Sequence, residues 1–368
     1  MRRLLVAGGG TGGHVYPLLA VLEALREADA SVQVLYLGGS GGLEERLTGQ
    51  HGVPFRGIPA GGLRGLGPRQ TVTNVGKLTR GALQALGEVR RFRPDVLLVT
   101  GGYVSVPAAV AGWLLRRPVV VCLPDVAPGL AVRLLARLAV AVTVSFEEVT
   151  ATLPAGKTVV TGYPLRPSFV RGDRATARQR LGVAPRERML VVFGGSRGAR
   201  SINDAVLDSL PGLLELGRVF HISGSNDYER VRRLAMGRDT CVDGRYRLYS
   251  YADHEMADLL WAADLVVARA GAATLAEFPA VGVPSIVVPY PYAGGHQMLN
   301  ATYLYDRGAA VIVEDGDLRT RLLPTVRELL LEPARLAAMA QAARRLAKPA
   351  ASQAVVDVLR RAAVGSGA

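Results

Sequence analysis

The chain alternates short apolar runs, rich in β-branched residues, with amphipathic stretches long enough to form helices. This alternation is typical of parallel sheets covered by helices, because parallel strands need a crossover segment between them. The sequence therefore predicts an α/β fold. In the first half, the expected strands are Arg3 to Ala7, Val32 to Leu37, Val96 to Thr100, Pro118 to Leu123 and Ala141 to Ser145. The helices expected between them include Pro17 to Ala28, Val75 to Arg91 and Val106 to Leu115.

The second half of the chain repeats this pattern. Its expected strands are Met189 to Phe193, Arg218 to Ile222, Leu265 to Val267 and Ser285 to Pro289. A chain of 368 residues is about twice the length of an ordinary domain, so we expect two Rossmann-like domains whose parallel sheets face a central cleft. The break is expected between residues 158 and 166, where a strand is followed by a Gly/Pro turn.

The charge of the chain indicates an anionic partner. The formal net charge is +13, and nearly all of the basic residues are arginine. Arginine binds phosphate through paired hydrogen bonds and stays protonated. A nucleic acid, an anionic lipid surface and a phosphorylated small molecule are all partners that this positive charge would attract. No zinc-finger, RNP or basic-region pattern is present, so nucleic acid is not expected as a partner.

The apolar runs and the cysteines of the sequence indicate the cellular compartment of the protein. The longest apolar runs, such as Val104 to Leu115, are shorter than the roughly 18 residues that a spanning helix needs. Cys122 and Cys241 lie far apart, so neither a disulfide framework nor a C-x-x-C site is expected. The first apolar stretch runs into glycines without the core of a signal peptide. We therefore expect a cytoplasmic protein.

A glycine-rich loop, Gly8-Gly9-Gly10-Thr11-Gly12-Gly13-His14, follows the first expected strand and precedes a helix. Backbone N–H groups in such a loop are offered to an anion at the helix N-terminus. The loop formally matches G-x-G-x-x-G. A dinucleotide site also needs an acidic residue at the end of the second strand, and this chain has none there. A nicotinamide enzyme is therefore disfavoured.

A second loop, Gly194-Gly195-Ser196-Arg197-Gly198-Ala199, repeats this arrangement in the second half. Tight strand-to-helix turns alone would explain one such loop. Two loops with hydroxyl and basic side chains beside the glycines favour a functional interpretation. The segment Gly156-Lys157-Thr158 is not a P-loop, because Ala151 stands where the first glycine is required.

Polar residues are also expected to gather at one sheet edge in the second half. The stretch from Asp264 to Glu277 predicts a strand, a tight turn of small residues and a helix with Glu277 one turn inside. A carboxylate there can accept hydrogen bonds from the paired hydroxyls of a ribose. An ordinary first-turn glutamate stabilised by the helix dipole is the alternative. His296 and Gln297 follow the next strand at the same edge.

Motifs along the whole chain carry a resemblance to a known family. They are Gly9-Gly10-Thr11-Gly12-Gly13-His14, Gly41-Gly42-Leu43-Glu44, Gly62-Leu63-Arg64-Gly65, Gly101-Gly102-Tyr103-Val104-Ser105, Pro164-Leu165-Arg166, Gly194-Gly195-Ser196-Arg197-Gly198-Ala199, Gly271-Ala272-Ala273-Thr274-Leu275-Ala276-Glu277 and His296-Gln297. Together they resemble the MurG family of glycosyltransferases, family 28. Enzymes of that family transfer N-acetylglucosamine (GlcNAc) from UDP-GlcNAc to undecaprenyl-pyrophosphoryl-MurNAc-pentapeptide in peptidoglycan synthesis.

The resemblance implies the GT-B fold. It implies an acceptor and membrane-facing domain at 1–160, a UDP-sugar domain at 161–350 and a C-terminal helix within 351–368 that returns to the first domain. It also implies inverting transfer to the MurNAc 4-hydroxyl, which turns lipid I into lipid II. No metal or other cofactor is obligatory in the family, since UDP-GlcNAc is a substrate. The family's position is peripheral, on the cytoplasmic face of the bacterial plasma membrane.

The resemblance also implies roles for individual residues. Donor contacts are implied at Arg166 and Ser196 for the phosphates, Glu277 for the ribose, His296 and Gln297 for the sugar, and the backbone near Ala252 for the uracil. Acceptor contacts are implied at Gly10, Thr11, Gly12, Gly13, His14, Tyr103 and Asp125. His14 is the first candidate for the catalytic base, because the unperturbed histidine pKa lies near working pH. Asp125 is the second.

Two segments depart from the family pattern. Cys122-Leu123-Pro124-Asp125 stands where the family has a His-Glu-Gln-Asn run, and Gly162-Tyr163-Pro164 replaces Gly-Asn-Pro. Both departures concern the acceptor and the cleft. The alternatives are therefore a related UDP-sugar transferase with another lipid or natural-product acceptor, and an enzyme like UDP-GlcNAc 2-epimerase. An epimerase would need further carboxylates in the cleft.

One expected helix, Val75 to Arg91, has a pattern typical of a membrane surface. Its apolar and basic residues are Leu78, Leu83, Val89, Lys77, Arg80, Arg90 and Arg91. With Trp113, Arg116 and Arg117 they predict a peripheral patch on an anionic bilayer. A core-facing helix with a solvated basic face is the alternative.

Overall fold

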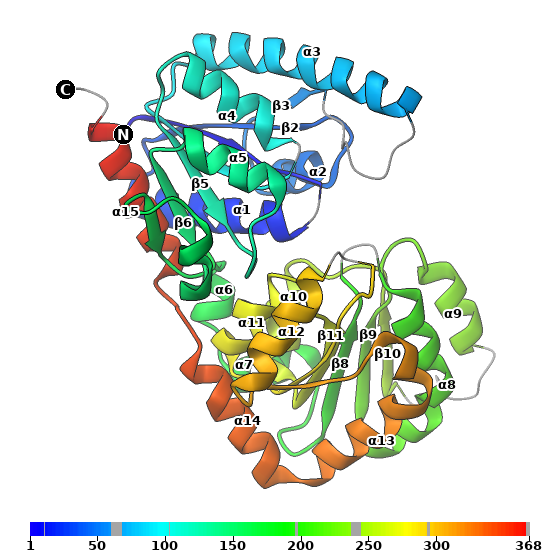
Figure 1. Ribbon diagram of the computed structural model, residues 1–368. Helices are drawn as coiled ribbons and strands as arrows, with labels where there is room; N and C mark the ends of the chain where they lie inside the picture. The colour runs from blue at the N-terminus through cyan, green and yellow to red at the C-terminus, as the bar shows by residue number, and fades with distance from the viewer. Residues whose placement is uncertain are drawn as a thin grey trace. The chain divides into compact units, whose positions relative to one another are not determined.

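The computed structural model describes residues 1–10, 12–59, 68–102, 104–195, 198–236, 244–292 and 295–365. Of residues 68–75, 77 and 78 it describes the backbone alone. The chain divides into two compact units. Unit 1 comprises Met1–Pro167 together with Lys348–Ala368, and unit 2 comprises Ser168–Ala347. Each unit is built around its own parallel sheet (Figure 1).

The sheet of unit 1, sheet A, has seven strands among the described residues, in the order β3-β2-β1-β4-β5-β6-β7, and every pairing is parallel. The strands are β1 (Arg3–Ala7), β2 (Gln33–Gly39), β3 (Phe55–Ile58), β4 (Val96–Thr100), β5 (Val119–Leu123), β6 (Ala141–Val144) and β7 (Thr158–Val160). The helices are α1 (Gly12–Ala28), α2 (Leu43–Gln50), α3 (Pro68–Phe92), α4 (Ser105–Leu114), α5 (Leu130–Leu138), the 3-10 helix η1 (Glu147–Thr152) and α15 (Ala351–Val364).

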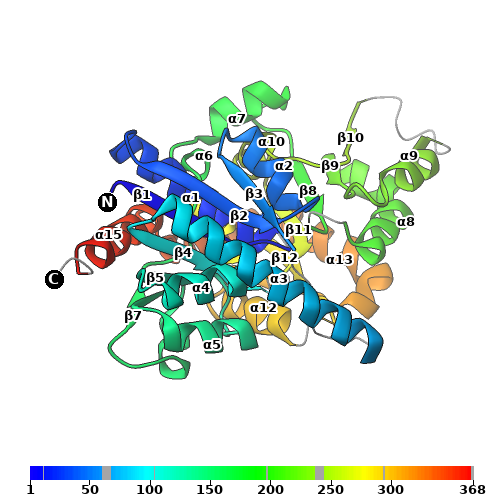
Figure 2. The ribbon, with the colours of Figure 1, turned by 90° about the horizontal axis from the view of Figure 1, so that it is seen from above.

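Helices cover both faces of sheet A. Leu4 and Val6 of β1 point to one face, where they pack with Leu18 of α1 and Leu359 of α15 in one buried cluster. On the other face lie α3 and α4, which run side by side in both views (Figures 1 and 2), and α5 packs beside α4. Because both faces are covered, the central strands are apolar at nearly every position rather than alternating.

The sheet of unit 2, sheet B, has six parallel strands among the described residues, in the order β10-β9-β8-β11-β12-β13. The strands are β8 (Met189–Phe193), β9 (Arg218–Ile222), β10 (Tyr246–Tyr249), β11 (Leu265–Arg269), β12 (Ser285–Val288) and β13 (Ala310–Ile312). The helices are α7 (Arg174–Leu181), α8 (Arg200–Leu216), α9 (Tyr228–Met236), α10 (Glu255–Ala262), α11 (Thr274–Val281), α12 (His296–Asp306), the 3-10 helix η3 (Asp315–Asp317), α13 (Leu318–Leu331) and α14 (Pro333–Arg345). The short helix α6 (Pro167–Val170) begins at Pro167, the last residue of the first segment of unit 1.

The strand order fixes where ligands can bind in each unit. In sheet A the chain steps from β1 to β2 on one side, and β4 pairs with β1 on the other. Sheet B repeats this order around β8, with β9 on one side and β11 on the other. In such doubly wound sheets, a crevice opens at the carboxyl ends of the two strands where the order reverses. Both glycine loops follow a strand at such a switch point.

The strands predicted for the sheet interiors are confirmed, but the three short strands β3, β10 and β13 are absent from the prediction. All three are edge strands. An arginine interrupts the apolar pattern of β3 and of β10, and β13 has only three residues. Two helices also begin earlier than predicted. Helix α1 begins at Gly12 rather than at Pro17, and α3 begins at Pro68 rather than at Val75. The two units with parallel sheets confirm the predicted α/β class.

Among the described residues, no helix combines the length and the apolar content that crossing a bilayer requires.

A buried polar cluster under sheet B links the stability of unit 2 to pH. The His221 side chain is fully buried on β9, with Nδ1 2.9 Å from the Tyr246 hydroxyl and Nε2 2.9 Å from Asn203 Oδ1. Asn203 Nδ2 donates to the Ser223 carbonyl, which fixes the orientation of the Asn203 amide. Its Oδ1 can only accept a hydrogen bond, so His221 Nε2 carries the ring proton and donates it to Oδ1. Burial lowers the pKa of His221 to about 3, so the ring is neutral in the folded protein.

We therefore predict that the protein loses stability as the pH falls below 6.5, because unfolded chains then protonate His221 while folded chains do not. The loss attributable to this side chain amounts to about 2 kcal/mol at pH 5. Thermal melts from pH 7.5 to 5 should therefore show a shallower pH dependence in His221→Gln than in the parent. The exposed His254, changed to Gln, is the control. Equal slopes in the parent and His221→Gln would contradict the prediction.

Candidate active site

The first glycine loop is a tight turn that carries the chain from β1 into α1. A Cβ on Gly8 would lie 2.2 Å from Thr100 Oγ1, and Gly10 has a φ of +88°, so both positions require glycine. The helix already includes Gly12, Gly13 and His14, which were predicted to lie in the loop. The first N–H groups of an α-helix have no intrahelical acceptor, so they are available to an anion at this edge of sheet A. Thr11 lies outside the described residues.

His14 lies in the first turn of α1, against the loop that follows β4. Its carbonyl accepts a hydrogen bond from Thr100 Oγ1 at 2.9 Å. Its ring faces the backbone of Gly101 and Gly102, since a Cβ on Gly101 would lie 3.2 Å from Nε2. Burial lowers the pKa of His14, and the negative charge of Asp125 opposes part of that shift. A neutral imidazole can accept a proton, as a general base must.

Asp125 follows β5, the strand next to β4 in sheet A, and is half-buried. Its negative charge acts to raise the pKa of His14, so the two candidate bases interact electrostatically. They lie more than 100 residues apart in the sequence, and the parallel order β1-β4-β5 brings the loops that carry them to one edge of sheet A. Tyr103, the remaining predicted acceptor residue of this edge, lies outside the described residues.

Arg166 lies near the end of the first segment of unit 1, after β7. Its side chain is buried, and its guanidinium carbon lies 4.8 Å from the centre of the Tyr16 ring on α1. A cation over an aromatic face is held by the ring quadrupole. The helix that carries His14 therefore also positions Arg166. Contact between Arg166 and a phosphate stays a prediction.

The second glycine loop lies at the switch point of sheet B, between β8 and α8. A Cβ on Gly194 would lie 2.3 Å from the Ala199 nitrogen, and one on Gly198 would lie 2.1 Å from the Ser223 carbonyl oxygen. Gly195 and Gly198 both have positive φ. The turn thus admits only glycine at these positions and presents the N-terminus of α8 to the sheet edge. Ser196 lies outside the described residues.

Glu277 lies in the first turn of α11, which follows β11 at the same switch point. Glu277 is buried, at only 8% exposed. The predicted strand, turn and helix around Glu277 are confirmed. Ala252 is buried and lies in the loop between the carboxyl end of β10 and the start of α10. The uracil contact implied there stays a prediction.

His296 and Gln297 begin α12, which follows β12 beside β11. Gln297 Oε1 accepts a hydrogen bond from the Tyr290 N–H at 2.9 Å, so a ligand would meet its Nε2 donor. Asn300 Nδ2 donates to the Ala270 carbonyl at 3.0 Å and ties α12 to the turn before Glu277. The structure therefore gathers Glu277, His296 and Gln297 at one edge of unit 2.

Sequence reasoning assigns no role to Arg269, which ends the buried strand β11. Its guanidinium pairs with Asp315 Oδ1 at 2.5 Å, donates to Ser201 Oγ at 2.8 Å and lies 5.2 Å from the centre of the Tyr290 ring. Arg269 therefore links the start of α8 to the loop that precedes α12. The signal in the sequence is an arginine at the end of an otherwise apolar strand, since a buried charge needs a partner.

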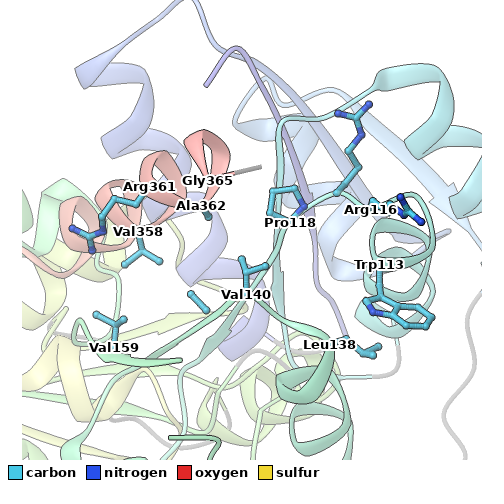
Figure 3. Close-up of a pocket in the computed structure, with 12 residues that line it drawn as sticks. Trp113, Arg116, Pro118, Leu138, Val140, Val159, Val358, Arg361, Ala362 and Gly365 are labelled. Atoms are coloured by element: carbon cyan, nitrogen blue, oxygen red, sulfur yellow. The ribbon is translucent and has the colours of Figure 1, made fainter. Parts of the chain in front are cut away.

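A pocket of about 530 Å³ lies elsewhere in unit 1 (Figure 3). Its lining includes Trp113, Arg116, Pro118, Val140 and Arg361. Pro118 and Val140 directly precede β5 and β6, so the pocket lies at the amino ends of these strands. The glycine loop and His14 lie at the carboxyl ends, so this pocket is not the candidate active site.

Comparison with known proteins identifies the family. The model of the glycosyltransferase family 28 N-terminal domain matches residues 4–144, and that of the C-terminal domain matches residues 189–355. A Desulforudis audaxviator (strain MP104C) protein named UDP-N-acetylglucosamine–N-acetylmuramyl-(pentapeptide) pyrophosphoryl-undecaprenol N-acetylglucosamine transferase is 41% identical over 369 residues. The alignment covers 98% of each chain.

Solved structures agree with this similarity. The crystal structure of Acinetobacter baumannii MurG has a TM-score of 0.75 and 29% identity, and covers 98% of this chain and 100% of that one. The UDP-GlcNAc 2-epimerase of Neisseria meningitidis, solved with UDP-GlcNAc bound, has a TM-score of 0.69 at 15% identity, over 98% and 100% of the two chains. At that identity the epimerase shows the fold alone. Because models of both of the family's domains match most of its length, this chain belongs to glycosyltransferase family 28, as the MurG-like motifs predict.

Proposed function

We propose that this enzyme transfers GlcNAc from UDP-GlcNAc to the 4-hydroxyl of MurNAc in undecaprenyl-pyrophosphoryl-MurNAc-pentapeptide, with inversion at the sugar. The product is lipid II, a precursor of the peptidoglycan cell wall that sets cell shape and is needed for division. The observation that carries the proposal is the full-length similarity to transferases named for this reaction. The glycine turns at both switch points support it, because each offers main-chain N–H groups to a diphosphate.

In the proposal, unit 2 binds the donor. The N-terminus of α8 and its glycine turn stabilise the UDP diphosphate, with Ser196 and Arg166 as the side chains proposed to contact the phosphates. Glu277 accepts hydrogen bonds from the ribose hydroxyls. His296 and the Nε2 donor of Gln297 contact the GlcNAc hydroxyls, and the backbone near Ala252 reads the uracil. UDP-GlcNAc is a substrate, so no further cofactor enters the proposal.

In the proposal, unit 1 binds the acceptor and removes its proton. The acceptor diphosphate binds at the N-terminus of α1, and Thr11, Tyr103 and Asp125 complete the acceptor contacts. The neutral imidazole of His14 takes the proton of the 4-hydroxyl as its oxygen attacks C1 of GlcNAc. The bond from C1 to the UDP oxygen breaks, and its electron pair leaves with UDP. Attack on the face opposite the leaving group inverts the configuration at C1.

We predict that the enzyme transfers label from UDP-[14C]GlcNAc to a lipid I analogue and releases UDP in equal amount. Glu277→Gln should raise the KM for UDP-GlcNAc about tenfold or more, because a charged hydrogen bond to ribose is lost. It should also lose the preference for the donor over its 2′-deoxyribose analogue. Glu229→Gln is the matched control, since Glu229 is an exposed glutamate in the first turn of α9. Conversion of UDP-GlcNAc to an isomer without acceptor would contradict the proposal.

The pH profile of transfer distinguishes the two candidate bases. With His14 as the base, kcat/KM should fall only below pH 6.5, because burial lowers its pKa. His14→Gln should lower kcat about a hundredfold or more. Asp125→Asn should raise the acceptor KM but keep kcat near the parent value, and it should move the acid limb to lower pH, because it removes the charge that raises the pKa of His14. Near-parent turnover in His14→Gln, with loss of turnover in Asp125→Asn, would assign the base to Asp125 instead.

We also propose that unit 1 docks on the cytoplasmic face of the plasma membrane, through the helices on one face of sheet A. Trp113, Leu114, Leu130 and Leu134 of α4 and α5 are each more than half exposed and form what we call the α4–α5 patch. Arg116, Arg133 and Arg137 flank it in sequence. Apolar side chains beside basic ones favour an anionic bilayer surface.

Helix α3 is the other helix whose sequence predicts a membrane-facing surface. Val89 and Ala85 are buried, as the core-facing alternative requires, whereas Leu83 and Arg80 are exposed. The side chains of Lys77 and Leu78 lie outside the described residues. Figure 3 shows Trp113 and Arg116 together at the end of α4, beside the pocket at the amino edge of the sheet.

We predict that Leu130→Gln/Leu134→Gln weakens binding to vesicles that contain phosphatidylglycerol, measured by co-sedimentation. Two leucines buried in the interface contribute a few kcal/mol at about 25 cal/mol per Å². Transfer to a detergent-soluble acceptor should stay at the parent rate. Leu331→Gln, an exposed leucine of unit 2, is the control. Unchanged sedimentation of the double variant would eliminate the α4–α5 patch as the docking surface.

A further inference from the structure

A buried carboxylate lies against the first glycine turn. Glu44, in the first turn of α2, is only 2% exposed. Its Oε1 accepts a hydrogen bond from the Gly39 N–H at 2.9 Å, and its Oε2 accepts one from the Gly10 N–H at 3.4 Å. A Cβ on Gly9 would lie 2.3 Å from Glu44 Oε1, so the carboxylate occupies the space that any larger residue at position 9 would need.

Burial of a carboxylate is costly unless hydrogen bonds or opposite charges compensate for the lost water. Within the part of the chain that the structure describes, main-chain N–H groups, not a basic side chain, provide that compensation for Glu44. A second hydrogen bond holds Gly8, at the start of the turn. The Tyr36 hydroxyl donates it to the Gly8 carbonyl at 2.9 Å. Burial, and to a smaller extent the charge of Glu44, raises the pKa of Tyr36, which keeps it a donor. The turn is therefore fixed at Gly8 and at Gly10.

The position of Glu44 matters because this turn belongs to the loop that receives an anionic ligand in the proposed function. The Gly10 N–H is engaged by Glu44, and a phosphate placed there would meet a like charge. The first N–H groups of α1, in Gly12 and Gly13, have no acceptor within the helix, and we infer that they bind the anion. Glu44 thus holds the Gly8–Gly10 turn, and the anion is left to bind at the start of α1.

We infer that Glu44 is a positioning residue for the acceptor. Its carboxylate fixes the Gly8–Gly10 turn, so that the acceptor diphosphate binds at the first N–H groups of α1, beside His14. The inference rests on the proposed function, because the acceptor is the ligand it concerns. Gly10 then serves the acceptor site by holding the turn through its N–H group.

An ordinary first-turn glutamate, stabilised by the dipole of α2, is the competing explanation. The neighbouring Glu45 provides the matched control, because it lies in the same turn, is exposed and accepts a hydrogen bond from the Gly41 N–H at 2.6 Å. A dipole effect would act on both glutamates. A positioning effect requires the carboxylate that contacts Gly10.

The test compares steady-state transfer by Glu44→Gln, Glu45→Gln and the parent, with acceptor and donor varied separately. Glutamine at 44 places an NH₂ group against one of the two N–H donors, so the turn should loosen. We expect the acceptor KM of Glu44→Gln to rise about tenfold, as loss of one charged hydrogen bond implies. The KM for UDP-GlcNAc should stay within about twofold, and the Tm within about 3 °C. Glu45→Gln should match the parent.

Chemical rescue provides a second readout that a purely structural role would not give. Glu44→Ala leaves space for a small carboxylate beside the Gly10 and Gly39 N–H groups, so formate should lower its acceptor KM whereas chloride should not. An unchanged acceptor KM in Glu44→Gln would overturn the inference, as would acceptor and donor parameters that worsen together with the Tm. Absence of transfer by the parent itself would instead overturn the proposed function.

Discussion

The structure depends on main-chain N–H groups at the switch point of each sheet. Parallel strand pairing places the start of a helix there. A strand leads to a glycine turn, and the turn leads to a helix whose first N–H groups lack internal acceptors. Side chains could not be added to these turns, since a Cβ on Gly8, Gly194 or Gly198 would lie within 2.3 Å of a neighbouring atom. Both units therefore place the start of a helix at a switch point, and the proposed function assigns an anion to each of these positions.

Buried charges hold these sites in place, and the two units use different ones. In unit 1, Glu44 accepts hydrogen bonds from the N–H groups of Gly10 and Gly39. In unit 2, Arg269 is neutralised by Asp315 and connects the start of α8 to Tyr290. A buried charge that stays paired is sensitive to the positions of its partners. Each therefore connects a loop at the carboxyl edge of its sheet to a neighbouring element of the same unit.

Sequence predicts the parts of this structure in which local signals and burial agree. The strand at β1 and the glycine loop after it are predicted because a fully buried strand is an unbroken apolar run. The start of α1 is not, since glycine is a poor helix former and Pro17 is the conventional first residue of a helix. The contacts of Glu44 and Arg269 could not be predicted, because their partners Gly10 and Asp315 lie 34 and 46 residues away along the chain. The proximity of His14 and Asp125 likewise arises from strand order alone.

In the proposed function, the switch point of sheet B binds the nucleotide and that of sheet A does not. Hydrogen–deuterium exchange of the full chain, with and without UDP, tests it most directly. The account predicts slower exchange in peptides that cover the start of α8 and the start of α11, with peptides around α1 and its glycine turn unchanged. Protection around α1, with none at α8 and α11, would contradict the account.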